Sequence, residues 1–395
     1  MGWVWAGAVP GQILSDWGAD VIKVESSRRL DPARQGRPII GDKPDPEQNS
    51  LHHNVNRGKR SVTIDITTEA GAGLVKALVA TADIVIENMS PHALAAAGLN
   101  YAALREVNPR IIMVSQPLAG QTGPYSNLRG YGPSVNGLTG LDYITGYEGS
   151  EQFAGFNHNI GDANVAMFAV VGLMAALRRR EHTGQGEYID LSMWEALTAH
   201  QAIGLLDFQM NGRRGQPRGH DHPLYSPYGI YRCQDDDVEE GWIAIVVETD
   251  TEWRSLCEAM GRAEWLADDR FSSHSNRRKH RDELDASITE WTRGWNKFEL
   301  EQFLQDRDIA GTACRNAGDR YLDTRLREWG TYVDVEHPVL GVEPLYGNPV
   351  RMERHKPPPL RRAPLLGEHN RQVLQEILGM SEEEVTQLEA DGVLR

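Results

Sequence analysis

The chain has 395 residues, of which 25% are charged and 40% hydrophobic, and this is enough for two or three globular domains. Its 41 basic and 56 acidic side chains give a formal charge of −15, which argues against nucleic acid or an anionic membrane surface as the main partner. The three cysteines lack any C-x-x-C spacing and indicate a reducing compartment without structural zinc. The longest apolar stretch, 165–177, is short for a bilayer, and no charged-then-apolar leader opens the chain. We therefore expect a soluble, cytoplasmic protein.

The first 120 residues alternate strand-like and helix-like segments. Helices are expected at 12–17 and 68–80, and clustered β-branched residues predict strands at 19–25, 61–66, 83–87 and 110–115. Such alternation predicts an α/β fold in which helices cover a parallel, Rossmann-like sheet. Because these folds bind ligands outside the carboxyl ends of the strands, chemistry is expected in the loops that follow the strands.

The rest of the chain divides at a polar stretch rich in Gly, Arg and His, 211–222. The segments expected before it are a functional loop at 118–161, a strong helix at 162–180, a strand at 185–192 and a helix at 193–208. Those expected after it are a hairpin at 228–247, helices at 251–260 and 282–305, a Pro-rich tether at 356–364, and tail helices at 368–378 and 382–391.

This order of elements predicts two domains. Residues 1–210 would form the first part of a large Rossmann-like domain, and 326–395 would be the return segment and C-terminal helices that complete it. Residues 220–325 would form a smaller α+β domain.

Asp162 opens the strongest predicted helix, directly after Asn159-Ile160-Gly161. One interpretation is structural: aspartate is a preferred N-cap, and the basic run 178–180 suits the negative end of the helix dipole. The other interpretation is catalytic. A carboxylate at a helix N-terminus is stabilised as the anion and could attack a carbonyl to form a mixed anhydride. The spacing does not separate these two roles, which are compatible.

Short motifs occur along nearly the whole chain. They are W-A-G-A-V-P-G-Q-I-L-S-D-W-G-A-D-V-I-K-V-E at 5–25, N-R-G-K-R-S-V-T-I-D at 56–65, A-D-I-V-I-E-N-M-S-P at 82–91, G-Q-T-G-P-Y at 120–125, R-R-R-E-H-T-G-Q-G-E-Y-I-D-L-S at 178–192, D-D-R-F at 268–271 and A-P-L-L-G-E-H at 363–369. Each is a weak signal alone. In number, order and spacing they resemble the class III CoA-transferase family, the group of formyl-CoA transferase, carnitine CoA-transferase and α-methylacyl-CoA racemase.

In that family the aspartate at the position of Asp162 is the nucleophile. The resemblance implies that Asp162 attacks an acyl-CoA thioester, releases CoA and forms an acyl-aspartyl anhydride. Returning CoA thiolate would give an aspartyl-CoA thioester, and a small acceptor carboxylate would then take over the CoA. This exchange needs no metal and no permanently bound cofactor, because CoA and acyl-CoA are substrates. Family members form interlocked dimers, so a homodimer is expected, with heteromeric pairing as an alternative.

The resemblance also implies contacts with CoA. The matched positions are Val4, Trp5, Arg34, Asn88, Met89, Arg129 and Tyr131. Val4 and Trp5 would line the thioester pocket, and Arg34 and Arg129 would lie near the phosphates. The dense basic cluster of Arg57, Lys59 and Arg60 suggests a positive patch, since guanidinium groups suit phosphate recognition. The structural alternative is a solvated loop face.

Other positions depart from the family. Thr67 and Ala96 stand where some relatives have basic CoA contacts, and Gly132 replaces an acidic residue of several transferases. The Gly-rich loop of formyl-transferring members has no counterpart near 220–228, so formate and oxalate are not expected as substrates. The openings W-V-W-A-G and S-S-R-R-L-D-P-A-R, with R-G-Y-G-P, resemble the branch of the family that transfers CoA to succinate-like or aromatic dicarboxylic acids. The chain also begins where relatives have completed a first strand, which leaves a sheet edge or pocket wall to be accounted for.

Three alternatives stay open. A racemase of the same family would need a histidine in G-H-D, where this chain has Gly130-Tyr131-Gly132. A dinucleotide-dependent oxidoreductase is suggested by Gly7 and Gly11 between a strand and a helix, but G-x-x-x-G is not the full G-x-G-x-x-G fingerprint. A non-catalytic subunit of a heteromeric transferase is disfavoured by the presence of Asp162.

Overall fold

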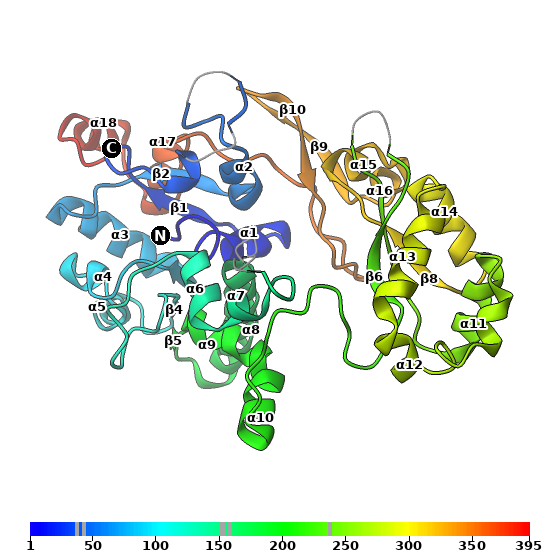
Figure 1. Cartoon of the computed structure of the whole chain (residues 1–395). Helices are drawn as coiled ribbons and strands as arrows, with labels where there is room; N and C mark the ends of the chain where they lie inside the picture. Colours follow the sequence, from blue (N-terminus) through cyan, green and yellow to red (C-terminus); the bar gives the residue numbers. More distant parts are fainter. Residues whose placement is uncertain (36–38, 42–44, 151–154, 156–159, 236–238) are drawn as a thin grey trace. The chain divides into compact units, whose positions relative to one another are not determined.

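The structure is a computed structural model that describes residues 1–35, 39–41, 45–150, 155, 160–235 and 239–395. The chain forms two compact units (Figure 1). Unit 1 consists of Met1–Asp142, Gly155–Arg214 and Arg325–Arg395, and unit 2 consists of Tyr143–Ala154 and Gly215–Thr324. Unit 1 is therefore built from segments that are far apart in the sequence.

Unit 1 contains two parallel sheets made of four-residue strands. β1 (Ile22–Glu25) pairs with β2 (Arg60–Thr63), and β4 (Ile112–Ser115) lies between β3 (Ile84–Glu87) and β5 (Glu187–Asp190). The predicted α/β class with parallel strands is confirmed. The structure differs in that the strands form two sheets and not one, since no ladder hydrogen bond joins the sheets within the described residues.

The first core of unit 1 lies between the sheets and the helices at both ends of the chain. α3 (Glu69–Thr81) begins where the Thr68 hydroxyl accepts a hydrogen bond from the Gly71 N–H, and it buries Val75, Leu78 and Val79. α17 (Asn370–Leu378) adds Val373 and Leu374 to the same core, so the C-terminal segment completes the fold that the first strands begin.

A second core forms around α8 (Ile160–Thr183). Its residues Ala169, Leu173 and Ala176 pack against β4, and the buried Arg180 bonds the carboxylate of Asp83. The helix has a mean hydropathy of 1.8 and meets the length and composition of a membrane span, which the shorter apolar run considered in the sequence does not. Its packing against the sheet is that of a core helix.

Further elements surround these cores. The helices of unit 1 are α1 (Val9–Asp16), η1 (Pro32–Arg34), α2 (Ser50–Asn56), α4 (Ala93–Ala96), α5 (Tyr101–Val107), α6 (Gly132–Leu138), α9 (Met193–Thr198), η2 (Ala199–Gln201), α10 (Ala202–Asn211) and α18 (Glu382–Ala390). Two short helices at the unit boundaries are α7 (Leu141–Ile144) and α16 (Thr324–Glu328). An antiparallel hairpin is formed by β9 (Tyr332–His337) and β10 (Gly341–Tyr346).

Unit 2 is built on an antiparallel sheet of β6 (Tyr228–Arg232), β7 (Trp242–Val246) and β8 (Ala310–Ala313). Its core is aromatic, with Trp253, Trp265 and Phe271 in contact. Its helices are α11 (Asp250–Ala259), η3 (Ala263–Ala267), α12 (His274–Lys279), α13 (Arg281–Thr292), α14 (Lys297–Gln305) and α15 (Ala317–Leu322). Part of the acidic turn between β6 and β7, 236–238, lies outside the described residues.

Three predicted elements differ from the structure because local signals interrupt them. The loop expected at 118–161 contains α6 and α7, and the helix expected at 193–208 is interrupted by η2. The helix expected at 282–305 is two helices, because the side-chain oxygen of Asn296 accepts hydrogen bonds from the N–H groups of Phe298 and Glu299 and starts a new helix, α14.

Candidate functional site

A cavity of about 1340 Å³ lies in unit 1, where β1, β2, β3 and β4 end. It exceeds the roughly 300–1,000 Å³ of ordinary small-molecule pockets, as a long ligand requires. The predicted site residues on its wall are Val4, Asn88, Met89, Arg129, Tyr131 and Asp162. The structure thus brings six of the eight predicted residues to one cavity, and it places the other two, Trp5 and Arg34, off its wall.

Asp162 lies in the first turn of α8, two residues after the helix begins at Ile160. The sequence predicts it as the N-cap, so this placement is a correction, and Asn159 lies outside the described residues. The side chain is 7% exposed and on the cavity wall. The backbone N–H of Ala6 favours the ionised form of this carboxylate, and Ala6 lies on the same cavity wall.

The environment of Asp162 raises its pKa to about 6, because burial removes water from the carboxylate and the Ala6 N–H only partly offsets that loss. Burial therefore outweighs the influences that favour the anion, among which the sequence leads us to expect the helix N-terminus. At pH 7 the group is still mostly ionised, and as a base it is stronger than an ordinary aspartate. This combination suits a carboxylate nucleophile.

The backbone approaches the cavity through a tight turn before α1. A Cβ on Gly7 would lie 2.3 Å from the Asn88 side-chain oxygen and 2.7 Å from the Gly2 Cα. The Asn88 amide bonds both the N–H and the C=O of Trp3, at 2.8 and 3.0 Å. Gly7 is therefore needed where the turn meets the end of β3.

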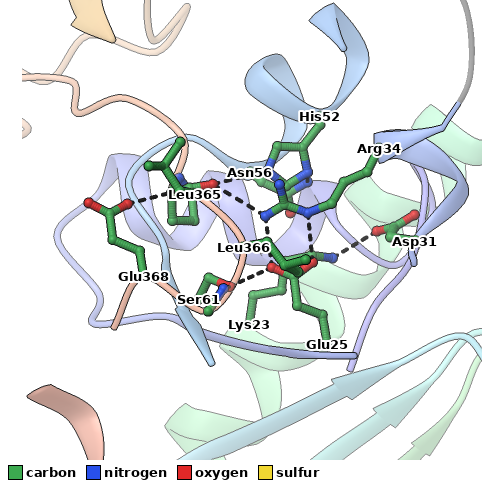
Figure 2. A network of polar contacts seen from close by, with 12 residues as sticks. Lys23, Glu25, Asp31, Arg34, His52, Asn56, Ser61, Leu365, Leu366 and Glu368 are labelled. Carbon is green, nitrogen blue, oxygen red and sulfur yellow. Dashed lines mark hydrogen bonds and ion pairs between the residues drawn. The ribbon is translucent and has the colours of Figure 1, made fainter. Parts of the chain in front are cut away.

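Arg34 lies in a buried polar network (Figure 2). Its guanidinium bonds both carboxylate oxygens of Glu25, at 3.0 and 2.8 Å, and one oxygen of Glu47 at 2.8 Å. A further bond reaches the backbone oxygen of Pro364 at 3.3 Å. The side chain is fully buried. Its contacts connect β1 to the C-terminal segment, and the guanidinium does not face the cavity.

The predicted basic cluster is likewise engaged. Arg57 pairs with the buried Asp16, and Arg60 pairs with Asp20 and Glu376. Lys59 donates to the backbone oxygens of Ala8 and Val55, and burial holds its pKa well below the ordinary lysine value. None of these three cations is on the cavity wall, so they do not form the expected phosphate patch.

Arg28 and Arg29 are cavity residues that the sequence reasoning misses. They directly follow β1, and Arg28 pairs with Asp65 at 3.3 Å while Arg29 lies over the Trp3 ring at 5.0 Å. With Arg129 they give the cavity three guanidinium groups. The signal that could have found them is their position after the carboxyl end of a parallel strand.

Other wall positions complete the site. Thr67 and Ala96, which stand where relatives have basic contacts, both line the cavity without bringing charge. Trp5 is half-buried, and its indole Nε1 is buried with no hydrogen-bond partner among the described residues. Tyr131 is 73% exposed. The arrangement is a large cavity whose wall carries three buried carboxylates, Glu25, Asp65 and Asp162, and three arginines. Glu25 is paired with Arg34 and Asp65 with Arg28.

Known proteins share this chain's sequence and fold. A family model, CoA-transferase family III, matches residues 1–370. The succinate–glutarate CoA-transferase of Agrobacterium fabrum is 34% identical over 95% of this chain and 92% of its own length. The formyl-CoA:oxalate CoA-transferase of Rhodopseudomonas palustris is 28% identical over 99% and 94%. A crystal structure of a CAIB/BAIF family protein from Brucella suis superimposes with a TM-score of 0.86 at 30% identity, covering 95% of this chain and 97% of that one.

These matches extend over nearly the whole chain and agree with the motif order in the sequence. They favour a transferase over the dinucleotide-dependent oxidoreductase. The chain belongs to CoA-transferase family III.

Proposed function

We propose that this protein transfers CoA from an acyl-CoA to a free carboxylic acid, with Asp162 as the nucleophile. The observation that carries the proposal is the placement of Asp162: a buried carboxylate on the wall of a cavity large enough for a long ligand. A purely structural aspartate at a helix end gains nothing from this burial, whereas a nucleophile gains basicity and protection from water.

The proposed chemistry is a sequence of acyl exchanges. An Asp162 oxygen attacks the thioester carbonyl, the C–S bond breaks, and CoA leaves as the thiolate. The thiolate then attacks the aspartyl carbonyl of the anhydride and releases the donor acid, leaving CoA as a thioester on Asp162. The acceptor carboxylate attacks that thioester and displaces the thiolate. The thiolate finally attacks the acceptor carbonyl of the new anhydride, which frees Asp162. The overall reaction exchanges one thioester for another of similar energy, while each anhydride is a higher-energy intermediate.

The cavity residues divide the binding of CoA between charge and shape. Arg28, Arg29 and Arg129 would bind its phosphates, because guanidinium forks match phosphate oxygens. Val4, Asn88 and Met89 would contact the chain that leads to the thioester. Arg34 would act from behind this wall by fixing the end of β1, from which Arg28 and Arg29 follow.

We propose a dicarboxylic acid of succinate-like or aromatic type as the acceptor. The relative from Agrobacterium fabrum is named for succinate and glutarate, and it covers the same length of chain. An acceptor with a second carboxylate would also find guanidinium groups at the cavity wall. Because Arg28 is already paired with Asp65, Arg129 is our choice for the second carboxylate or the phosphates.

We propose that the protein works as a homodimer of the interlocked kind in the cytoplasm. Two apolar surfaces of unit 1 support a second copy as the partner. On α8 they are Met167, Phe168, Val171 and Met174, and on α10 they are Ile203, Leu205, Leu206, Phe208 and Met210. Figure 1 shows α10 extending away from the sheets of its unit. A cavity of about 560 Å³ beside Trp194 and Leu205 belongs to the same region.

A substrate screen tests the proposal. The enzyme is incubated with succinyl-CoA and, in turn, glutarate, an aromatic dicarboxylate, oxalate and formate, and new thioesters are measured by chromatography. We expect transfer to the first two acids at rates at least about tenfold above the others, as pocket discrimination of a missing contact allows. Hydrolysis without transfer, or oxalate as the best acceptor, would contradict the proposal.

A further inference from the structure

Val4 has a backbone φ of 54°, in the left-handed region that β-branched residues rarely adopt. The other non-glycine residues with positive φ in the described part of the chain are His92 and Asp308, and neither is β-branched. Val4 also lies on the wall of the cavity that contains Asp162. Strain of this kind persists only where surrounding contacts impose it.

Asp31 supplies the contact that holds Val4. One of its carboxylate oxygens accepts hydrogen bonds from the N–H groups of Val4, at 3.0 Å, and Ala33, at 2.9 Å. The other oxygen pairs with Lys23 Nζ at 2.8 Å, and Lys23 also donates to the Gly2 carbonyl at 3.1 Å. The Lys23 and Asp31 side chains are 2% and 0% exposed. This buried pair therefore holds the backbone at Gly2 and Val4, on either side of Trp3.

The turn continues to the reacting group. Two residues after Val4, Ala6 lies on the same cavity wall as Asp162, and its N–H favours the ionised form of that carboxylate. Beyond it, Lys59 Nζ bonds the Ala8 carbonyl at 2.7 Å and fixes the start of α1. The backbone between these two anchors therefore carries the N–H that meets Asp162.

We propose that Asp31, held ionised by Lys23, is a positioning residue that keeps Val4 in its strained conformation and thereby aims the Ala6 N–H at the Asp162 carboxylate. The relevance of this device to catalysis rests on the proposed nucleophilic role of Asp162. The device itself acts on the carboxylate with or without CoA, so it can be measured in the free enzyme.

Two influences set the proton affinity of Asp162, burial and the Ala6 N–H. If Asp31 stops holding Val4, the turn relaxes and the Ala6 N–H moves away from the Asp162 carboxylate, while burial remains. The pKa of Asp162 should then rise further above its native value. A residue with a merely structural role would lower stability without moving this pKa.

The test is a ¹³C NMR titration of protein labelled at the aspartate carboxyl carbon, with the Asp162 signal assigned through D162N. Asp31→Ala should raise the pKa of Asp162 by roughly half a unit to one unit, because the Val4 N–H loses its acceptor. Asp31→Asn keeps a side-chain oxygen for that N–H and should leave the pKa within about 0.3 of the native value. Asp16→Ala, which breaks the buried pair with Arg57, is the matched control and should leave the pKa unchanged.

A second substitution separates strain from general damage. Glycine adopts positive φ without a steric penalty, so Val4→Gly in the Asp31→Ala background should bring the pKa of Asp162 back toward its native value. Loss of the carboxylate with no change in the pKa, or an equal rise in D31A and D31N, would overturn the proposal.

Hydrogen exchange of the native protein decides the matter if Asp31→Ala does not fold. Protected N–H groups at Val4 and Ala6 are the expected result, and exchange as in a free peptide would overturn the proposal. Either outcome is independent of CoA transfer, so a failure of the proposed function would leave this measurement intact.

Discussion

At the scale of single residues, the chemistry depends on how far the protein raises the basicity of one carboxylate. The pKa of Asp162 is about 6 because burial dominates over a single hydrogen bond. The nucleophile must be ionised, so kcat/KM should fall tenfold per pH unit below about pH 6 and stay flat above it. Initial rates at subsaturating acyl-CoA, measured from pH 4.5 to 8, check this. A limb centred near pH 4 would contradict the burial of Asp162.

The raised pKa of Asp162 also makes the stability of the protein depend on pH. The folded protein binds the Asp162 proton more tightly than the unfolded chain, so ionised Asp162 costs stability above about pH 6, and this cost disappears below about pH 4. Asp162→Asn should therefore raise the free energy of unfolding at pH 7.5, by up to about 3 kcal/mol, and change it little at pH 4. Chemical denaturation at both pH values measures this. An equal effect at the two pH values would show that the carboxylate does not titrate as described.

Substitution of an arginine should have a different effect according to whether the side chain lies on the cavity wall or in the buried network. Arg129→Ala should raise KM for acyl-CoA about tenfold and weaken its dependence on salt, because a wall cation is lost. Arg34→Ala should instead lower stability by about 3–5 kcal/mol, since it removes the cation that neutralises the buried Glu25 and the partly buried Glu47. Steady-state kinetics and denaturation distinguish the two variants.

Arg178→Ala is the control for both arginine variants, because this side chain is exposed at the far end of α8. It should change neither KM nor stability appreciably. If Arg34→Ala were stable and impaired only in KM, the buried network of Figure 2 would not describe its role.

At the scale of elements, local sequence patterns predict the helices and strands better than they predict where one element ends and the next begins. The strands and α3 follow from β-branched runs and the N-cap Thr68, and the structure confirms these features. The break before α14 depends on Asn296, a cap inside a helical pattern, and such a signal competes with periodicity. The role of Gly7 could not be predicted, because its neighbour Asn88 lies 81 positions away.

The tight turn before α1 gives a direct test at this scale. Gly7→Ala should lower both stability and activity, because the added Cβ meets the Asn88 side chain and the Gly2 backbone. Gly73→Ala is the control: it sits in α3 with open space around its Cβ, and it should stabilise the helix by about 1 kcal/mol. Thermal unfolding and initial rates of both variants are compared. Full activity in G7A would show that the turn can accommodate a Cβ at this position.

At the scale of the whole molecule, the candidate site was only partly predictable from the sequence. The family resemblance predicted Asp162 and five other residues that lie on the cavity wall, and the rule that ligands bind beyond strand ends predicted the region. The contacts that the charged side chains make could not be predicted in the same way. Arg57 pairs with Asp16, 41 positions away, and Lys59 donates to the Ala8 carbonyl, 51 positions away, so the fold engages two cations of the predicted cluster in buried contacts. The −15 net charge is thus a background against which Arg28, Arg29 and Arg129 act locally.

The proposed dimer belongs to this scale as well. Ile203→Asp on α10 should weaken self-association at least tenfold, because that side chain is 84% exposed within a group of apolar neighbours. Val107→Asp, on α5, places the same charge on a partly exposed apolar side chain outside that group and should leave the dimer intact. Sedimentation velocity over a concentration series measures both. A monomeric native protein would contradict the dimer without touching the role of Asp162.

The most direct test of the nucleophile is mass spectrometry of the protein trapped with acyl-CoA. Hydroxylamine converts an activated aspartyl carbonyl to a hydroxamate, and borohydride reduces it, so either reagent leaves a stable mark on the residue that formed the anhydride or thioester. We predict that the mark maps to Asp162, depends on acyl-CoA, and is absent in Asp162→Asn. Unmodified Asp162 in protein that still exchanges CoA would contradict the central claim.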